Sequence, residues 1–381
     1  MFPDAPIRPW LAALREQVPG IELFDAHTHI GANDPDGNKC TAEELIEGLA
    51  GAGGARSAVF PMHEPDGYPQ ANDMVIAAAA ESGGALTAYC RLDPHDDPLA
   101  EAERCLAAGA AGIKLHPRAE AFPLDTPELE PVFALADERG LPMLVHAGRG
   151  IPALGRHALQ VTERHPGLRL ILAHCGISDL AWIWREADDH PNLFFDTAWW
   201  SASDLLALFT LVSPGHILFA SDAPYGTPAF AATLHLRYAL QAGLTHDQIR
   251  LVFGGQMARI LAGDGPADGG PAAGPGSLDR DPLLDRLHTF LVAAIGQMFI
   301  GVDPAEQLAL AALACKVDDD APQAAVCAMV LDLLERRREH LKSGRPDYGP
   351  DRLAPGFPLI VMAAAIARTP DVPLPGRSVD Q

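Results

Sequence analysis

Short apolar runs alternate with longer amphipathic runs from residue 21 to about residue 226. The short runs have the length typical of buried strands, and the longer ones have the periodicity typical of helices. Several helix-like runs end at a glycine, for example at Gly109 and Gly140, as the C-termini of helices often do. The predicted strands are residues 21–30, 57–64, 85–92, 112–117, 142–148, 169–175, 192–198 and 217–222.

Eight strands that alternate with helices predict an α/β fold with a parallel sheet. With eight such repeats in roughly 250 residues, a closed (β/α)8 barrel, the TIM barrel, is the most economical arrangement. A doubly wound open sheet is the alternative, but no Gly-x-Gly-x-x-Gly turn follows the first predicted strand. We therefore predict that residues 1–263 form a TIM barrel.

The pattern changes after the predicted barrel. Residues 264–278 form a tract rich in Gly, Pro and Ala without periodicity, which is typical of a linker. Residues 279–381 contain only helix-like runs and no motif that indicates chemistry. We predict a small all-helical C-terminal domain there, with helices at residues 282–300, 304–316, 322–342 and 357–367.

Composition and charge narrow the class of partner. Hydrophobic residues make up 48% of the 381, which is ample for a large core, and the formal net charge is −22. A surface this acidic repels nucleic-acid phosphates and anionic lipid, so we expect a small-molecule substrate and neither nucleic acid nor membrane as partner. The N-terminus lacks the features of a secretory signal, and six cysteines without a Cys-x-x-Cys pair suit a cytoplasmic protein. The formation of a homo-oligomer is compatible with these features.

Five side chains that bind metals or move protons stand at the ends of predicted strands. His27 and His29 end the first strand and point the same way, because side chains alternate along a strand. Asp25 shares their face one layer deeper and is expected to support them. The C-terminal ends of barrel strands open on one face, where active sites are built. We therefore expect the pair to meet the residues that end strands five, six and eight: His146, His174 and Asp222.

Three imidazoles and a carboxylate suit one divalent ion, Zn2+ above all and, with different tuning, Mn2+, Fe2+ or Co2+. We predict that His27, His29, His146 and Asp222 bind it and leave room for a water, whose pKa the ion would lower to about 7. His174 is then free to polarise a substrate carbonyl or to carry a proton. Asp222 would combine metal binding with accepting a proton from the water.

The sequences DAHTHIG, GIKLHP, LVHAG, LAHCG and SDAPYG occur in this order. As an ordered set they resemble the amidohydrolase superfamily and, within it, the amidohydrolase-related branch, also called amidohydrolase 2. The resemblance covers about residues 21–262. It implies one metal bound by the His-x-His pair, the strand-five His and the strand-eight Asp, with the strand-six His catalytic, which is the assignment reached above.

Three further residues are candidates for substrate binding. Lys114 in GIKLHP stands where other amidohydrolases carry a carboxylated lysine that bridges two metals; a substrate-binding or electrostatic role and a structural role are the alternatives. His116 shares its strand face and the same alternatives. Arg91 at the end of strand three either binds a substrate carboxylate in a bidentate pair or forms an ion pair within the rim.

Three functions remain as hypotheses. The first is a metal-dependent hydrolase that uses activated water on an amide, lactone or ester carbonyl of a small molecule. The second is a non-oxidative metal-dependent decarboxylase of a small carboxylic acid, aromatic acids included. Decarboxylase members of the family tend to carry an arginine in the loop after strand one, and residues 31–40 contain none, which favours hydrolysis. The third is a non-catalytic metal-binding scaffold, which would have no need of His174.

Overall fold

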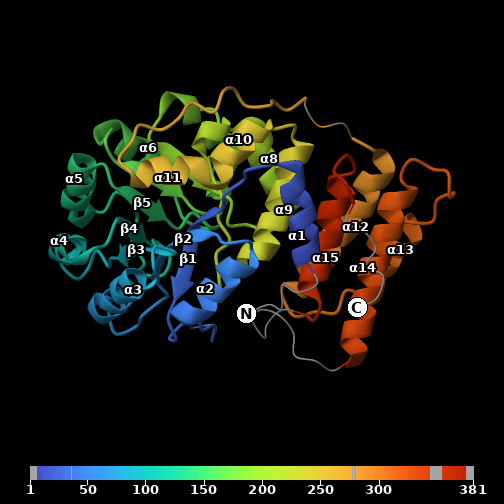
Figure 1. Ribbon diagram of the computed structural model, residues 1–381, viewed down its shortest axis with the longest axis horizontal. Coiled ribbons are helices and arrows are strands. Elements are labelled where there is room, and N and C mark those ends of the chain that lie inside the picture. Colours follow the sequence, from blue (N-terminus) through green and yellow to red (C-terminus); the bar gives the residue numbers. More distant parts are fainter. Residues whose placement is uncertain (1–6, 36, 277, 279, 344–353, 375–381) are drawn as a thin grey trace.

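The structure is a computed structural model that describes residues 7–35, 37–276, 278, 280–343 and 354–374. Eight parallel strands form one sheet in the order of the sequence and curl into a barrel surrounded by helices (Figure 1). The predicted TIM barrel and all eight of its strands are confirmed. The strands are β1 (Phe24–Ile30), β2 (Arg56–Pro61), β3 (Leu86–Arg91), β4 (Gly112–Leu115), β5 (Pro142–Val145), β6 (Arg169–Leu172), β7 (Leu193–Asp196) and β8 (Ile217–Leu218).

Hydrogen bonds join the first strand to the chain that follows the last one. The amide of Asp222 donates to the carbonyl of His27 at 2.9 Å, and the amide of His29 donates to the carbonyl of Ala223 at 2.7 Å. These bonds continue the ladder from β8 back to β1. They also fix Asp222 beside the His-x-His pair, although the two are far apart in the sequence.

Helices follow the strands and cover the outside of the barrel (Figure 1). Gly109 and Gly140, the predicted helix ends, have φ values of 115° and 64°, which glycine adopts without strain after a helix. The helices of this part are α1 (Arg8–Gln17), α2 (Ala42–Gly51), α3 (Pro69–Glu81), α4 (Pro98–Ala108), α5 (Glu130–Arg139), α6 (Leu154–Arg164), α7 (Leu180–Ile183), α8 (Ala202–Leu211), α9 (Pro228–Gln241), α10 (His246–Arg250) and α11 (Gln256–Leu261).

The strands end earlier than predicted, so three candidate residues lie in the loops that follow them. His146 is the first residue after β5, His174 opens a short 3-10 turn after β6, and Asp222 lies four residues beyond β8. His174 and Asp222 have φ values of 56° and 60°, in the left-handed region that is incompatible with a strand. The apolar pattern does not reveal these bends, because His174 directly follows an apolar run and only Ser221 separates Asp222 from one.

The described residues of the C-terminal part form four helices: α12 (Pro282–Met298), α13 (Ala305–Ala314), α14 (Ala324–Ser343) and α15 (Phe357–Arg368). We call them the helical extension. They pack on one another, and α15 also lies against α8 and α9, so the extension stands at one side of the barrel (Figure 1). The tract before it is tied to the barrel, since Gln256 exchanges hydrogen bonds with the backbone of Ala267. The division at residues 263 and 279 stays a prediction.

A buried arginine fastens the extension to the barrel. Arg237 of α9 is 1% exposed, and its guanidinium donates to the hydroxyl and carbonyl of Thr369 at 2.9 and 3.0 Å and to the carbonyl of Pro373 at 2.9 Å. Burial lowers the pKa of Arg237 to about 10. The segment that follows α15 thereby supplies hydrogen-bond acceptors to the guanidinium of Arg237, which would otherwise be a buried cation without partners.

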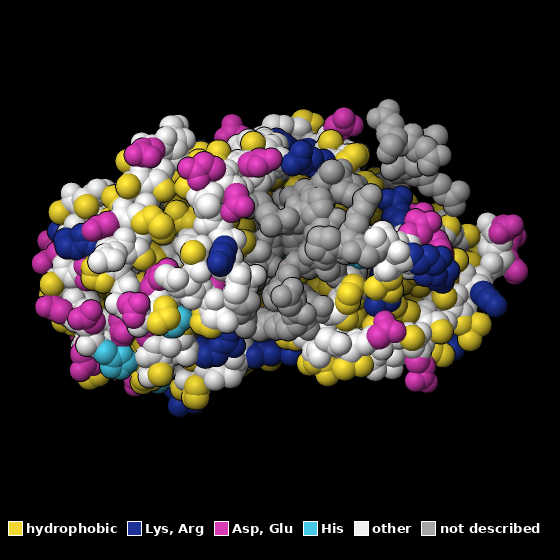
Figure 2. Space-filling model, turned by 90° about the horizontal axis from the view of Figure 1, so that it is seen from below, with side chains coloured by type: hydrophobic (Ala, Val, Ile, Leu, Met, Phe, Trp, Pro, Cys, Tyr) yellow, Lys and Arg dark blue, Asp and Glu magenta, His cyan; other side chains and the backbone are white. Residues whose placement is uncertain are grey.

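Most of the exposed large hydrophobic side chains among the described residues belong to the helical extension, where hydrophobic side chains gather (Figure 2). Acidic side chains are scattered over both parts in this view. No helix within the described ranges combines the length and the apolar character that a bilayer crossing requires. Exposed large hydrophobic side chains of the extension are Val292, Phe299, Ile300, Val302, Leu310, Leu313, Leu331 and Leu341.

Candidate metal centre

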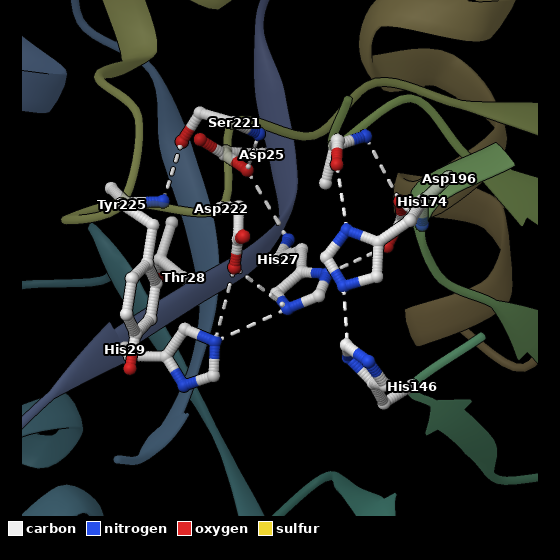
Figure 3. Close-up of polar contacts among 12 residues, drawn as sticks. Asp25, His27, Thr28, His29, His146, His174, Asp196, Ser221, Asp222 and Tyr225 are labelled. Carbon is white, nitrogen blue, oxygen red and sulfur yellow. Dashed lines mark hydrogen bonds and ion pairs between the residues drawn. The ribbon is translucent and has the colours of Figure 1, made fainter. Parts of the chain in front are cut away.

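Three ligand atoms meet at the C-terminal mouth of the barrel (Figure 3). Nε2 of His27 lies 3.2 Å from Nε2 of His29 and 3.2 Å from Oδ1 of Asp222, and Nε2 of His29 lies 3.3 Å from the same oxygen. The three atoms therefore form a nearly equilateral triangle. Both histidines are buried, and the carboxylate side chain is 22% exposed.

The partners of the other ring nitrogens assign the tautomers. Nδ1 of His27 lies 2.7 Å from Oδ2 of Asp196, and Nδ1 of His29 lies 3.4 Å from the carbonyl of Pro61. Both partners only accept hydrogen bonds, so each Nδ1 carries the proton and each Nε2 presents a lone pair to the other. Burial, followed by the charge of Lys114, holds the pKa of both imidazoles well below the usual range, which disfavours a proton between them.

A divalent cation fits this donor set. Tetrahedral bonds of about 2.05 Å to nitrogen and oxygen place neighbouring ligand atoms about 3.3 Å apart, the spacing of the triangle. His27, His29 and Asp222 form a group that could hold a metal ion. Two lone pairs and a carboxylate facing one another in a buried site repel unless a cation lies among them. Burial raises the pKa of Asp222 to about 6, a cost that a bound cation would offset.

His146 lies beside this group rather than in it. Its Nδ1 lies 2.9 Å from Nε2 of His174, and its ring stacks on that of His116 with 3.9 Å between centroids. Its Nε2 is buried without a hydrogen-bond partner among the described residues. That atom faces Gly148, where an added Cβ would come within 2.6 Å of it. Metal binding by His146 therefore stays a prediction, and it requires a different rotation of the ring.

His174 is held in one tautomer. Its Nδ1 lies 2.7 Å from the carbonyl of Ala198 and must carry the proton, so Nε2 accepts the hydrogen bond from Nδ1–H of His146. Burial lowers its pKa, which favours the neutral ring. A neutral His174 therefore presents a proton acceptor at the mouth of the barrel, near the metal group: its ring centroid lies 5.1 Å from that of His27.

Asp196 is the functional residue that the sequence analysis missed. One oxygen accepts from His27 Nδ1 at 2.7 Å, and the other accepts from the amides of His174 at 2.8 Å and Ala198 at 2.9 Å. A single buried carboxylate thus orients a predicted ligand and the predicted proton acceptor. The sequence does contain an indication of this role, because Asp196 is an acidic residue at the end of a buried strand, after three apolar residues (LFFD).

Asp25 supports the backbone of the site rather than the ring of His27. Its Oδ1 accepts from the amide of His27 at 3.2 Å and from the amide of Ser221 at 2.9 Å. It therefore ties β1 to the loop that carries Asp222. Burial raises the pKa of this carboxyl to about 7.

The candidate substrate residues have different surroundings. Arg91 forms a buried ion pair with Glu120 at 2.6 Å, which agrees with the second of its two predicted roles. Lys114 is buried, its Nζ lies 4.7 Å from the Phe60 ring centroid, and no described residue accepts a hydrogen bond from it. Burial and the neighbouring Arg91 lower the pKa of Lys114 to about 7. His116 is half-buried, and its Nδ1 accepts from the amide of Ala119 at 3.1 Å.

One cavity of about 880 Å3 is lined by all the predicted metal, catalytic and substrate residues: His27, His29, Arg91, Lys114, His116, His146, His174 and Asp222. Ligand sites of proteins commonly measure roughly 300–1,000 Å3, so the cavity has room for a whole small molecule. Its floor is formed by the metal group, His174 and Lys114. Part of its outer wall comes from the helical extension.

Comparisons with known proteins agree with this architecture. A family model described as amidohydrolase matches residues 24–261. A search of curated proteins found no match. The structure resembles 5-carboxyvanillate decarboxylase from Sphingomonas paucimobilis with 16% identity and a TM-score of 0.50, covering 64% of this chain and 99% of that one. It resembles a protein described as amidohydrolase II with 19% identity and a TM-score of 0.51, covering 63% and 100%. At such identities the likeness shows the fold alone.

Proposed function

The chain belongs to the amidohydrolase family, and on that basis we propose that it is a metal-dependent hydrolase. Its substrate would be an amide, lactone or ester of a small molecule, whose carbonyl is attacked by water. The observation that carries the proposal is the triangle of His27 Nε2, His29 Nε2 and Asp222 Oδ1 next to His174, on the floor of one cavity.

His27, His29 and Asp222 would hold one divalent ion, most suitably Zn2+, with His146 as the predicted fourth ligand. When bound, such an ion supplies a water of lowered pKa and an electrophile for a carbonyl oxygen. Asp196 keeps the proton of His27 on Nδ1, so that the Nε2 lone pair stays directed into the triangle.

The tautomer of His174 determines which of its nitrogens can take up a proton. Nδ1–H of His174 is committed to the carbonyl of Ala198, so Nε2 is the atom that would take up a proton when water attacks. Nε2 now accepts from Nδ1–H of His146, and the rotation that would turn His146 toward the metal group would release it. The protonated ring can then return that proton to the leaving group. Polarising a carbonyl would require a proton already on Nε2, which the neutral tautomer lacks. The structure therefore supports the proton-carrying role of His174 over the polarising role.

Metal analysis and a substrate panel test the proposal. The purified protein is expected to contain a divalent metal and to hydrolyse at least one member of a panel of esters, lactones and amides. His174→Ala should lower kcat by roughly 100- to 10,000-fold, the usual contribution of a general acid–base residue. His95→Ala is the matched control, because His95 is exposed, pairs with Asp93 and lies outside the cavity.

Other outcomes select another function. Hydrolysis that is absent, or that survives His174→Ala unchanged, contradicts the hydrolase. Release of CO2 from a hydroxybenzoate panel would establish the decarboxylase instead. This alternative is supported by two similar structures, of 5-carboxyvanillate decarboxylase and 2,6-dihydroxybenzoate decarboxylase. Bound metal without turnover in either panel would support the third hypothesis, a non-catalytic metal-binding scaffold.

A further inference from the structure

Part of the outer wall of the cavity is built by helices that lie beyond the residues matched by the family model. The family model ends at residue 261, and nearly the whole of each similar chain is matched by 63–64% of this one. Gly296 and Phe299 near the C-terminal end of α12, together with Phe357 and Pro358 at the start of α15, nevertheless line the same cavity as the metal group. The extension is therefore in reach of a bound substrate.

Aromatic rings connect the floor of the cavity to the extension. The ring of His174 lies 6.1 Å from that of Trp199, which lies 5.4 Å from that of Trp200. Trp200 in turn stacks on Phe299 at 5.8 Å and meets Phe357 edge-on at 5.8 Å. A continuous aromatic surface thus runs from the predicted proton acceptor to the helices of the extension.

One of the aromatic rings that line the cavity is only partly buried. Phe299 is 40% exposed, although a ring that served only to attach the extension would be expected to bury its surface. Large open aromatic surface beside a ligand cavity is typical of a site that recognises an apolar group.

Gly296 keeps the space in front of these rings open. It lies inside the 17-residue helix α12, where glycine is destabilising relative to alanine. A Cβ at this position would meet no atom within 4 Å, so it would project into open space where Gly296 lines the cavity. Packing within the helix therefore does not require glycine here, and a larger side chain at this position would take up room in the cavity.

We propose that the helical extension forms a specificity pocket in which Trp200, Phe299 and Phe357 bind an aromatic or extended apolar group of the substrate. The reacting carbonyl would lie at the metal group, and the apolar group would lie against the rings. The substrate class is then an aryl-substituted or long-chain ester, lactone or amide, rather than a short acyl compound. This inference rests on the proposed hydrolase for the reaction, but the binding of the apolar group can be measured without turnover.

Binding of two carboxylates tests the pocket directly. Titration calorimetry with 4-phenylbutyrate and with butyrate should show that the phenyl compound binds at least about tenfold more tightly, which corresponds to one well-placed aromatic contact. Gly296→Leu, which fills the space, and Phe299→Ala, which removes a ring, should each abolish most of the difference. Ala293→Leu is the matched control, because it places the same leucine side chain at an exposed position of α12 that does not line the cavity.

Hydrolysis of the matched pair methyl 4-phenylbutyrate and methyl butyrate gives the second measurement. A preference for the phenyl ester that Gly296→Leu removes and Ala293→Leu keeps supports the pocket. Equal kcat/KM for both esters, or equal affinity for both carboxylates, overturns the pocket and leaves the hydrolase intact. If neither of these esters nor any member of the ester, lactone and amide panel is hydrolysed but the phenyl compound still binds selectively, the hydrolase fails and the pocket stands.

Discussion

Replacing Asp196 by asparagine tests how the barrel prepares His27 for metal binding. The carboxylate accepts three N–H groups, from the ring of His27 and from the amides of His174 and Ala198, at 2.7–2.9 Å. An asparagine keeps one acceptor oxygen, which the two amides occupy. Its NH2 group then faces Nδ1–H of His27, and two donors cannot bond.

The expected loss follows from the tautomer. The NH2 group of the asparagine needs an acceptor, so the proton of His27 moves from Nδ1 to Nε2, the atom that belongs to the metal triangle. Loss of a carboxylate behind a metal-binding histidine costs about 10- to 100-fold in affinity. Because the substitution also reverses the tautomer, we expect the upper end, about 100-fold or 2.7 kcal/mol.

Competition with a chromophoric chelator measures the Zn2+ affinity of Asp196→Asn and of the wild type at pH 7. Asp93→Asn is the control, because Asp93 also holds a histidine Nδ1, that of His95 at 2.8 Å, on the exposed surface away from the cavity. Circular dichroism confirms that both variants are folded. Wild-type affinity in a folded Asp196→Asn protein would refute the argument that this carboxylate sets the tautomer of His27.

Three further outcomes are expected. Arg237→Met should lower the free energy of unfolding by about 3 kcal/mol in a urea titration, since it leaves the carbonyls of Thr369 and Pro373 without their charged donor; an unchanged midpoint would contradict this. Burial lowers the pKa of His235 from 6.5 to about 4 in the folded protein. Between these two pH values the unfolded chain binds a proton at this position and the folded protein does not, so the free energy of unfolding falls as the pH drops from 6.5 to 4. His235→Gln should remove about 3 kcal/mol of that fall in unfolding titrations across this range, and an identical pH dependence would count against it. Gly148→Ala should displace the ring of His146, whose Nε2 would be 2.6 Å from the new Cβ, and lower kcat about tenfold; unaltered kinetics would show that this ring position is not needed.

The sequence by itself determined the barrel and the inventory of its site. Periodicity located all eight strands, because a strand buried on both faces has to be apolar along its length. Alternation along the first strand placed His27 and His29 on one face, and the parallel topology placed Asp222 and His174 at the same mouth. These features depend on local spacing and on one rule of topology, and both can be read from a linear chain.

The tertiary structure decided how the buried polar groups are paired. Asp196 turned out to orient His27, Arg91 to pair with Glu120, and His146 to face His174 rather than the triangle. Asp196 and Arg91 end strands β7 and β3, and their partners come from other parts of the chain, so sequence spacing does not reveal the pairs. His146 and His174 lie in loops, and the left-handed backbone of His174 is not visible in the apolar pattern. The docking of the helical extension belongs with these pairings, because helix amphipathicity shows that a face is buried but not which distant surface buries it.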